Sequence, residues 1–488
     1  MLTPATPRPV EMYRDIWRRR SPDEIRQLAH TKRFLECVMG DPEFRVRATP
    51  DREALSALAR QRGCEIDPYD LLPLWHRDFV EFQNDMGPEA WSGAWRWRQY
   101  LKEMVATRDA MLVAGDPGDV NPAFAAWRNR QIARTRSELG ANASGIVHPI
   151  VAYELSDGCS VGCWFCGISA EKFRGHLTFE AGAGLWRGVL ETMRDRFGAA
   201  ASTGFCYWAT DPLDNPDYVR FLEVYREVNG TIPQTTTAIP LRRPELTAQV
   251  LSLWQTDRCV TNRFSILSAN IMRRLHQTFT PEELMGVELV LQQGGALSTK
   301  AFAGRVRPEG KVQDVQAEMA DKARSRNTVL TEGTIACVTG FLVNMVKRTI
   351  RLVSPCRPTE AVPDGYHVFA EATFADAADF GLVLDDMVAR HVSNAVPSDR
   401  PLAFRDDLAF ERIGRGFQLR NNHVRVKVSR FGELAERIAG GDHTLDELAA
   451  RCEELGAVPI EALLFVDESF RAGLLNETPR PTATGAPA

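Results

Sequence analysis

The chain has 488 residues, with 59 Lys and Arg against 64 Asp and Glu, and a formal net charge of -5. Its hydrophobic fraction of 44% and charged fraction of 25% are those of globular proteins, which excludes a collagen-like, mucin-like or largely disordered chain. The slightly acidic balance argues against nucleic-acid binding and against a polybasic membrane anchor. Because no apolar run could span a bilayer and no secretory signal opens the chain, we expect a cytoplasmic protein with no membrane partner.

Residues 1–145 are predicted to form a helical domain followed by a linker. In Asp51–Arg62 and Trp91–Arg108, apolar residues recur at spacings of three and four, as on one face of a helix. Gly, Asn and Pro interrupt residues 115–145, so this stretch is predicted to be a linker around one short helix.

Residues 146–400 are predicted to form an α/β barrel domain, because short apolar runs alternate there with helical patterns. Such alternation is typical of parallel βαβ units in an open sheet or a (β/α) barrel, where active sites lie at the carboxyl ends of the strands. The predicted strands are Ile150–Leu155, Gly204–Ala209, Gln234–Ile239, Arg263–Leu267, Val287–Leu291, Thr334–Val338 and Thr349–Val353. The predicted helices include Thr178–Phe197, Pro216–Asn229 and Arg243–Trp254.

Residues 401–475 are predicted to form a small winged-helix-like domain. Gly416–Leu419 and His423–Val428 flank a turn at Arg420–Asn422, which is typical of a hairpin, and three short helices follow. The middle helix opens with Thr444 and Glu447 in capping-box spacing. Residues 476–488 are rich in Pro, Thr and Ala and are predicted to be disordered.

Three cysteines follow the first predicted barrel strand at close spacing. Cys159, Cys163 and Cys166 are separated by three and two residues, within Glu154–Ser169. Three thiolates can hold a [4Fe–4S] cluster, which normally takes four, and leave one iron free for a small chelating ligand. A structural zinc ion is the alternative, but it needs four ligands, and no fourth lies nearby in the sequence. The spacing therefore indicates an iron–sulfur cluster.

This cysteine spacing, with an aromatic residue before the last cysteine, resembles the signature of the radical S-adenosylmethionine (radical SAM) family. The resemblance implies a partial (β/α)6-type barrel, a SAM molecule chelated to the fourth iron, and a 5′-deoxyadenosyl radical formed after reduction of the cluster. Phe205–Pro212 stands where the family places a GGE-like segment for the methionine amine, but reads Ala-Thr-Asp-Pro at its end. The residues expected to bind SAM are Phe165, Thr210, Asp211, Arg263 and Ser265.

Further segments resemble a narrower group, the peptide epimerases that modify ribosomally made peptides, of which polytheonamide epimerase is the type example. They are Phe34–Phe44, Asp67–Trp75, Tyr207–Tyr218, and Ser354–Pro358 with Gly365 and Tyr366, and the resemblance covers about residues 30–475. It implies that Cα hydrogen abstraction turns an L-residue of a precursor peptide into a D-residue. It also implies a flavodoxin or ferredoxin as electron donor.

Inversion requires a hydrogen atom for the other face of the Cα radical, and a thiol is the suitable protein donor because its S–H bond is weak. Cys356 follows a predicted strand in a turn fixed by two prolines, so it is the first candidate. Cys337 is the second, although its apolar surroundings also fit a buried structural thiol. The other cysteines outside the motif are Cys37, Cys64, Cys206, Cys259 and Cys452.

The small domain is the candidate site for the leader sequence of the precursor peptide. An edge strand would accept an extended leader by β-augmentation, and Gly416–Leu419 is the candidate edge. The alternatives are a structural cap and leader binding by the amino-terminal helices. For the whole chain, a radical SAM maturase with excision or crosslinking chemistry is the nearest alternative, and a non-catalytic leader-binding protein is the other. No cysteine-rich extension follows the barrel, which disfavours thioether-forming maturases.

Overall fold

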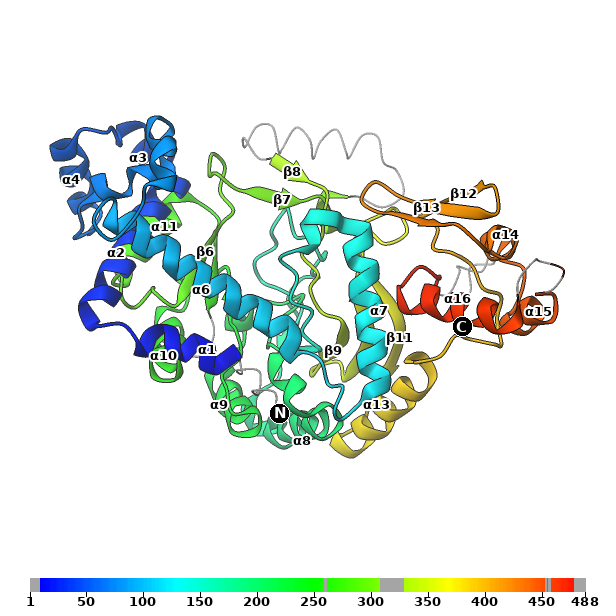
Figure 1. The fold of residues 1–488 in the computed structure, drawn as a ribbon. Coiled ribbons are helices and arrows are strands. Elements are labelled where there is room, and N and C mark those ends of the chain that lie inside the picture. The colour runs from blue at the N-terminus through cyan, green and yellow to red at the C-terminus, as the bar shows by residue number, and fades with distance from the viewer. Residues whose placement is uncertain (1–8, 259–260, 308–328, 453, 455–457, 478–488) are drawn as a thin grey trace, which may run out of the picture.

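The computed structural model describes residues 9–258, 261–307, 329–452, 454 and 458–477. It is a mixed α/β structure, so the predicted α/β class is confirmed at this level. Helices at the amino-terminal end lie to one side of a central α/β body, and a small α/β unit from the carboxyl end lies on the other side (Figure 1). Cys259 and the predicted disordered tail beyond Glu477 lie outside the described residues.

The described part of residues 1–145 forms helices and no strand, as predicted. Ser21 and Glu24 make a reciprocal capping box at the start of α2, and Asp41 caps the next helix by accepting the Glu43 and Phe44 amides. The predicted short helix in the linker is wrong, because α7 has 18 residues. The helices are α1 (Pro9–Arg18), α2 (Pro22–Gly40), α3 (Pro42–Arg47), α4 (Arg52–Gln61), α5 (Leu72–Trp75), α6 (Ser92–Ala114) and α7 (Pro122–Leu139).

A four-stranded sheet lies at the centre of the body. Its strands are β1 (Val151–Glu154), β9 (Gly340–Asn344), β10 (Thr349–Pro355) and β11 (Tyr366–Thr373), in that spatial order. β1 and β9 are parallel, whereas β10 is antiparallel to both β9 and β11. Only residues 345–348 connect β9 to β10, which is too short for a crossover and forces the chain to turn back. The expectation that every strand of the body runs parallel is therefore wrong at β10.

A second sheet contains β4 (Thr236–Thr237), β5 (Asn262–Ile266) and β6 (Val287–Leu291), all parallel. A single parallel bridge joins Phe205 to Ala152 of β1. The described strands therefore leave the two sheets separate and close no barrel. The helices of the body are α8 (Phe179–Phe197), α9 (Tyr218–Asn229), α10 (Pro244–Asp257), α11 (Ala269–Thr278) and α13 (Ala377–His391).

Two predicted strands are not formed as expected. Residues 334–338 are irregular, because the Thr334 hydroxyl accepts the Ala336 amide and turns the backbone out of ladder geometry. Gly204–Ala209 is reduced to the bridge at Phe205. The predictions for β1, β4, β5, β6 and β10 are confirmed to within a few residues. Two short pairs complete the body: β2 (Ser156–Asp157) with β3 (Gly175–His176), and β7 (Thr299–Ala301) with β8 (Val329–Thr331).

The carboxyl-terminal unit has its own buried core, built around Phe417, Leu434 and Phe465. Its sheet has the order β12 (Ala409–Ile413), β13 (Gly416–Arg420), β14 (Arg425–Val428), and its helices are α14 (Gly432–Gly440), α15 (Leu445–Ala450) and α16 (Pro459–Arg471). The predicted capping box at α15 is confirmed. The choice of Gly416–Leu419 as an edge strand is wrong, because β13 is the central strand and both of its sides are paired.

The carboxyl-terminal unit packs against α7. Arg130 pairs with Glu477 at 2.9 Å, and Arg405 donates to the Ser137 hydroxyl at 2.8 Å. Within the described residues, no helix combines the length and the apolar character needed to cross a membrane.

Candidate functional site

The cysteine loop, residues 158–170, leaves the carboxyl end of β1 through β2. Gly158 has a φ of +76°, and a Cβ there would stand 2.2 Å from the Lys172 carbonyl oxygen. This close approach lets the Cys159 amide donate to the Glu171 carbonyl at 2.9 Å. The loop is therefore closed at its base by backbone contacts that require glycine.

Gly304 and Arg305 hold the other side of the cysteine loop. The Arg305 amide donates to the Cys166 carbonyl at 2.9 Å, and its guanidinium donates to the Cys163 carbonyl at 2.7 Å and to the Ala170 carbonyl. Gly304 has a φ of +58°, and a Cβ there would stand 2.3 Å from the Cys166 carbonyl oxygen. Because these contacts use carbonyl groups of the loop, they fix its path without engaging the thiols themselves.

The three motif thiols are half-buried and form no disulfide, whereas Cys37, Cys64, Cys206 and Cys356 are buried. Burial raises the pKa of Cys159 to about 12 and the pKa of Cys163 to about 11. Thiolates at these positions would need a metal cation to form at neutral pH.

The three sulfur atoms do not all lie within 4.8 Å of one another, a spacing that another group of side chains in the described chain does reach. Thiolates of a single tetrahedral zinc ion stand about 3.8 Å apart. In this structure the three sulfur atoms are therefore spaced too widely for one zinc ion.

Asp211 lies beside the cysteine loop and joins two strand ends. Its carboxylate accepts the Thr237 hydroxyl at 2.8 Å and the Ala238 amide at 2.7 Å, both just after β4. Its negative charge acts on both Cys159 and Cys163. Burial raises the pKa of Asp211 to about 6. A buried carboxylate with this pKa would be stabilised by a cation such as an ammonium group.

Two other predicted SAM contacts also lie at this end of the strands. Thr210 is buried next to Asp211. Phe165 lies in the cysteine loop, with the Lys300 ammonium 5.1 Å from the centre of its ring. The structure thus brings Phe165, Thr210 and Asp211 to the same strand ends as the three cysteines.

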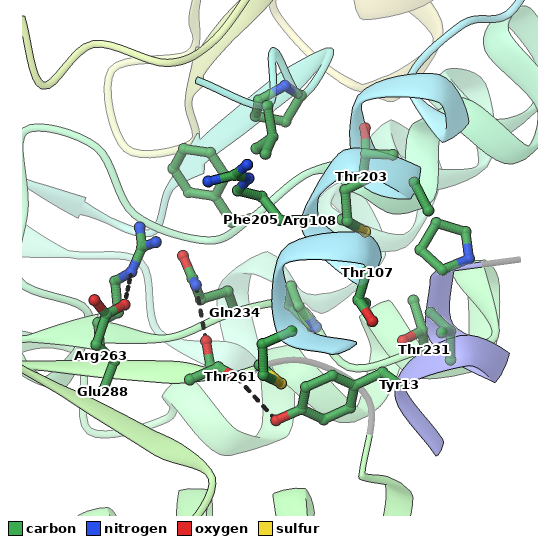
Figure 2. A pocket seen from close by; sticks show the side chains of 18 of the residues that line it. Tyr13, Thr107, Arg108, Thr203, Phe205, Thr231, Gln234, Thr261, Arg263 and Glu288 are labelled. Atoms are coloured by element: carbon green, nitrogen blue, oxygen red, sulfur yellow. Dashed lines mark hydrogen bonds and ion pairs between the residues drawn. The ribbon is translucent and has the colours of Figure 1, made fainter. Parts of the chain in front are cut away.

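A cavity of about 1290 Å³ lies at the opposite, amino-terminal ends of the parallel strands. Residues just before β1, β4 and β5 line it, together with α1, α2 and α6 of the helical domain. Figure 2 shows a chain of hydrogen bonds in its wall, from Tyr13 to Thr261 at 2.9 Å and from Gln234 to the Thr261 carbonyl at 2.7 Å. The cavity exceeds the size of typical small-molecule pockets, about 300–1,000 Å³. It has room for a peptide segment.

Arg263 lies in the wall of this cavity. Its guanidinium pairs with Glu288 of the neighbouring strand β6 at 2.9 Å (Figure 2). Ser265 lies two residues further along β5, on the same face of the strand, and is half-buried. Arg263 is thus a cavity residue with a carboxylate partner of its own.

Cys337 connects the cavity to the cysteine loop. It lines the cavity, and it also packs against an apolar cluster that includes Phe205 and Trp208. Ile168, two residues after Cys166, packs against the same cluster. Burial raises the pKa of Cys337 to about 12, so its thiol keeps its hydrogen. A half-buried thiol therefore lines the cavity and packs against the same apolar cluster as the cysteine loop.

Cys356 lies elsewhere. Because β10 is antiparallel to β9, its last residues sit at the start of β9, where Val353 is level with Gly340. Cys356 is 1% exposed, is not among the described residues that line the cavity, and faces Glu138 and His367 instead. The argument that a strand end delivers Cys356 to the carboxyl-terminal edge of a parallel barrel is therefore wrong in its direction.

Some residues that shape the site are missed by sequence reasoning. Asp214 accepts the Ser160 amide at 2.9 Å, and the buried Glu154 accepts the Ala209 amide at 2.8 Å and the Asn344 side chain at 2.9 Å. Glu154 and Asp214 stand within the two motifs that were singled out, so their nearness to the motifs was a usable signal. Arg305 lies more than 100 residues away from the cysteines, and no local pattern marks it.

Comparison with known proteins gives one strong match. No family model matches the chain. Over 471 residues, 96% of this chain and 91% of the relative, it is 40% identical to "Uncharacterized protein y4wI" of Sinorhizobium fredii (strain NBRC 101917 / NGR234). At this identity and coverage the chain belongs to the same protein family as y4wI of Sinorhizobium fredii.

Proposed function

We propose that the chain is a radical SAM enzyme that converts L-residues into D-residues in a ribosomally made precursor peptide. The observation that carries the proposal is the placement of Cys159, Cys163 and Cys166 at the carboxyl end of β1, with Asp211 beside them. The body would then be an open, partial (β/α)6-type barrel, with β1, the Phe205 segment, β4, β5 and β6 as its parallel strands. The carboxyl-terminal unit would be a winged-helix-like domain.

The cofactors of this proposal are a [4Fe–4S] cluster and S-adenosylmethionine, which together would supply a hydrogen-abstracting radical. Cys159, Cys163 and Cys166 would hold the cluster through their thiolates. Asp211 would hold the methionine amine, since its buried carboxylate lacks a cationic partner within hydrogen-bond distance in the described residues. Thr210 and Phe165 would line the same ligand. Arg263 fits the carboxylate or ribose of SAM less well, because Glu288 already pairs with it.

The cavity would take the peptide. Its lining includes residues just before β1, β4 and β5, and the target Cα would have to reach from there to the SAM bound at the cysteine loop. The mixed wall, with Trp75, Trp97 and Met104 beside Gln234 and Arg263, offers apolar surface for side chains and hydrogen-bonding groups for the backbone.

The geometry favours Cys337 over Cys356 as the hydrogen donor. Cys337 lines the cavity and shares an apolar cluster with the cysteine loop, while Cys356 is 1% exposed and is not among the described residues that line the cavity. The hydrogen that inverts a Cα radical must come from the face opposite the abstraction, so the Cα would have to lie between the Cys337 thiol and the bound SAM. Burial keeps the thiol protonated, which is the form that carries the hydrogen atom.

Leader recognition is proposed for an edge of the carboxyl-terminal sheet. With β13 in the centre, the open edges are β12 and β14. On β12, the exposed Arg412 is paired with Glu433 and Glu436 of α14. On β14, Arg425 and Lys427 are exposed, which would suit a leader with acidic residues. A flavodoxin or ferredoxin would supply the electron.

The test is anaerobic reconstitution with iron and sulfide, reduction, and addition of SAM, with 5′-deoxyadenosine as the readout. Adding a candidate precursor peptide in D2O then separates the chemistries. Epimerisation adds one deuterium per inverted residue and leaves the mass otherwise unchanged, whereas excision or crosslinking changes the mass in ordinary water. A fully loaded protein that forms no 5′-deoxyadenosine with peptide present would support a non-catalytic leader-binding protein.

A further inference from the structure

Three metal-ligating side chains converge where the carboxyl end of α7 meets the end of β10 and the start of β11. Glu138 comes from the end of α7, Cys356 follows β10, and His367 is the second residue of β11. A carboxylate oxygen, the sulfur and a ring nitrogen all lie within 4.8 Å of one another. Strand pairing fixes this arrangement, because His367 is level with Ser354, two residues before Cys356.

Two of these three side chains make no hydrogen bond through their possible ligand atoms within the described part of the chain. Among the described residues, no hydrogen bond reaches the Cys356 sulfur or the His367 ring, and Cys356 is 1% exposed. The neutral imidazole of His367 would offer a ring-nitrogen lone pair to a metal. Glu138 accepts the Arg357 amide at 2.8 Å, which orients its carboxylate toward the other two groups.

The charges around the group suit a divalent cation. A thiolate and a carboxylate would together cancel a charge of +2, so the filled site would be neutral. Arg134 lies 3.5 Å from Glu138 and also donates to the Pro355 carbonyl at 3.2 Å. Arg405 is the other nearby cation, and Asp407 neutralises it at 2.8 Å. Arg134 would thus hydrogen-bond the ligating carboxylate from outside, as such outer groups do in known metal sites.

We propose that Glu138, Cys356 and His367 form a zinc site with an exchangeable fourth ligand. One sulfur, one imidazole nitrogen and one carboxylate oxygen form a donor set that zinc accepts, and three protein ligands leave one tetrahedral position for water. Ligand atoms of bound zinc stand about 3.3–3.6 Å apart, so side-chain movements of about 1 Å would close the site. The site is separate from the cysteine loop and independent of the proposed radical chemistry.

Bound zinc would join α7 to the ends of β10 and β11. The same stretch of α7 holds the carboxyl-terminal unit through Ser137 and Arg130. Zinc at this point would therefore stabilise the junction between the body and the unit proposed to bind the leader.

The test uses the full chain with Cys159, Cys163 and Cys166 replaced by alanine, so that the cluster thiols cannot bind metal. The chelator-stripped protein is titrated with Co²⁺, and the thiolate-to-cobalt charge-transfer band is recorded, followed by Zn²⁺ competition against a chromogenic chelator. We expect one bound ion with this band. Cys356→Ser should lose the band, and His367→Gln and Glu138→Gln should weaken binding about tenfold or more.

Matched controls are Cys452→Ser, whose thiol bonds the Leu448 carbonyl, and His423→Gln on the exposed hairpin; neither should change binding. No band in the parent, a band that survives Cys356→Ser, or unchanged affinity in His367→Gln would overturn the proposal. If the parent does not fold by circular dichroism, zinc-edge X-ray absorption of the cluster-loaded wild type decides. A site with one sulfur and lighter ligands supports the proposal, and absent zinc or an all-sulfur site overturns it.

Discussion

The cysteines at the two ends of the central sheet have different surroundings. In the cysteine loop, glycine turns and carbonyl contacts shape the backbone while three thiols remain half-buried. At Cys356, regular secondary structure surrounds a thiol that is 1% exposed and faces a carboxylate and an imidazole. We propose a cluster with its SAM ligand for the first arrangement and a single zinc ion for the second.

The direction of one strand produces this difference. Had β10 run parallel to β9, Cys356 would have emerged at the edge where Cys159 lies; its antiparallel pairing places it at the other end. Cys337 reaches the interior by another route, on an irregular segment that leads into β9. A cysteine that follows a strand therefore has no defined place until the pairing of that strand is known.

The largest effect is expected from replacing a cysteine of the cysteine loop rather than a cysteine elsewhere in the chain. Cys163→Ala should abolish cluster binding and all 5′-deoxyadenosine formation, because two thiolates cannot hold the cube that three hold. Iron content, the visible absorption of the reconstituted protein and 5′-deoxyadenosine are the measurements. Cys452→Ser is the control and should keep all three. Full SAM cleavage by Cys163→Ala would contradict the cluster assignment.

The next prediction sets Cys337 against Cys356. Cys337→Ala should retain SAM cleavage with the precursor peptide but lower deuterium incorporation from D2O about 100-fold or more, because a missing general donor typically costs this much. Cys356→Ala should keep deuterium incorporation near the wild-type level. The reverse outcome would return the donor role to Cys356 and would remove the distinction between the two ends of the sheet.

Much of the fold could be predicted because it depends on local patterns. The alternation at Val287–Leu291 and the capping box at Thr444 both concern neighbouring residues, and both are confirmed. The cysteine motif is also local, so its position after β1 could be read directly. The irregular path of residues 334–338 could not, since an apolar run has the same composition in a strand and in a buried loop.

The rest of the site depends on contacts between distant residues. Arg305 reaches the cysteine loop across more than 130 residues, and Glu138 meets Cys356 across more than 200. The strand order of the carboxyl-terminal sheet also depends on pairing that no local pattern indicates. The sequence does not predict β12, and the pairing of β12 with β13 makes β13 the central strand. No spacing rule in one sequence contains such information.

The raised pKa of Asp211, beside the cysteine loop, should change how the free energy of unfolding depends on pH. Burial raises the pKa of this carboxyl from 3.8 to about 6, so the folded chain keeps a proton that the unfolded chain releases. The free energy of unfolding should therefore fall as pH rises from about 4 to about 6, by up to about 3 kcal/mol at this residue. Urea titrations across this pH range measure the free energy of unfolding. In Asp211→Asn, the part of its pH dependence that falls with rising pH should be missing.

Asp385→Asn is a control of opposite sign for that experiment. Arg196 lowers the pKa of Asp385, so this carboxylate stabilises the fold above its unfolded pKa and loses that effect as pH falls. If the free energy of unfolding of Asp211→Asn had the wild-type dependence on pH, the raised pKa of this buried carboxyl beside the cysteines would be contradicted.

The smallest predicted effect concerns the backbone contact that closes the cysteine loop. Both Gly304 and Gly414 have positive φ, +58° and +57°, but a Cβ at Gly304 would stand 2.3 Å from the Cys166 carbonyl, whereas one at Gly414 has nothing within 4 Å. Gly414→Ala should lower the free energy of unfolding by about 1 kcal/mol, the cost of left-handed backbone alone. Gly304→Ala should add about 2 kcal/mol to that cost and reduce iron loading, because the cysteine loop must move. Urea unfolding and iron content measure both. Equal effects of the two substitutions would mean that the close contact of Gly304 with the Cys166 carbonyl does not hold the cysteine loop. A Cβ at Gly304 would then cost no more than one at Gly414, which has open space around it.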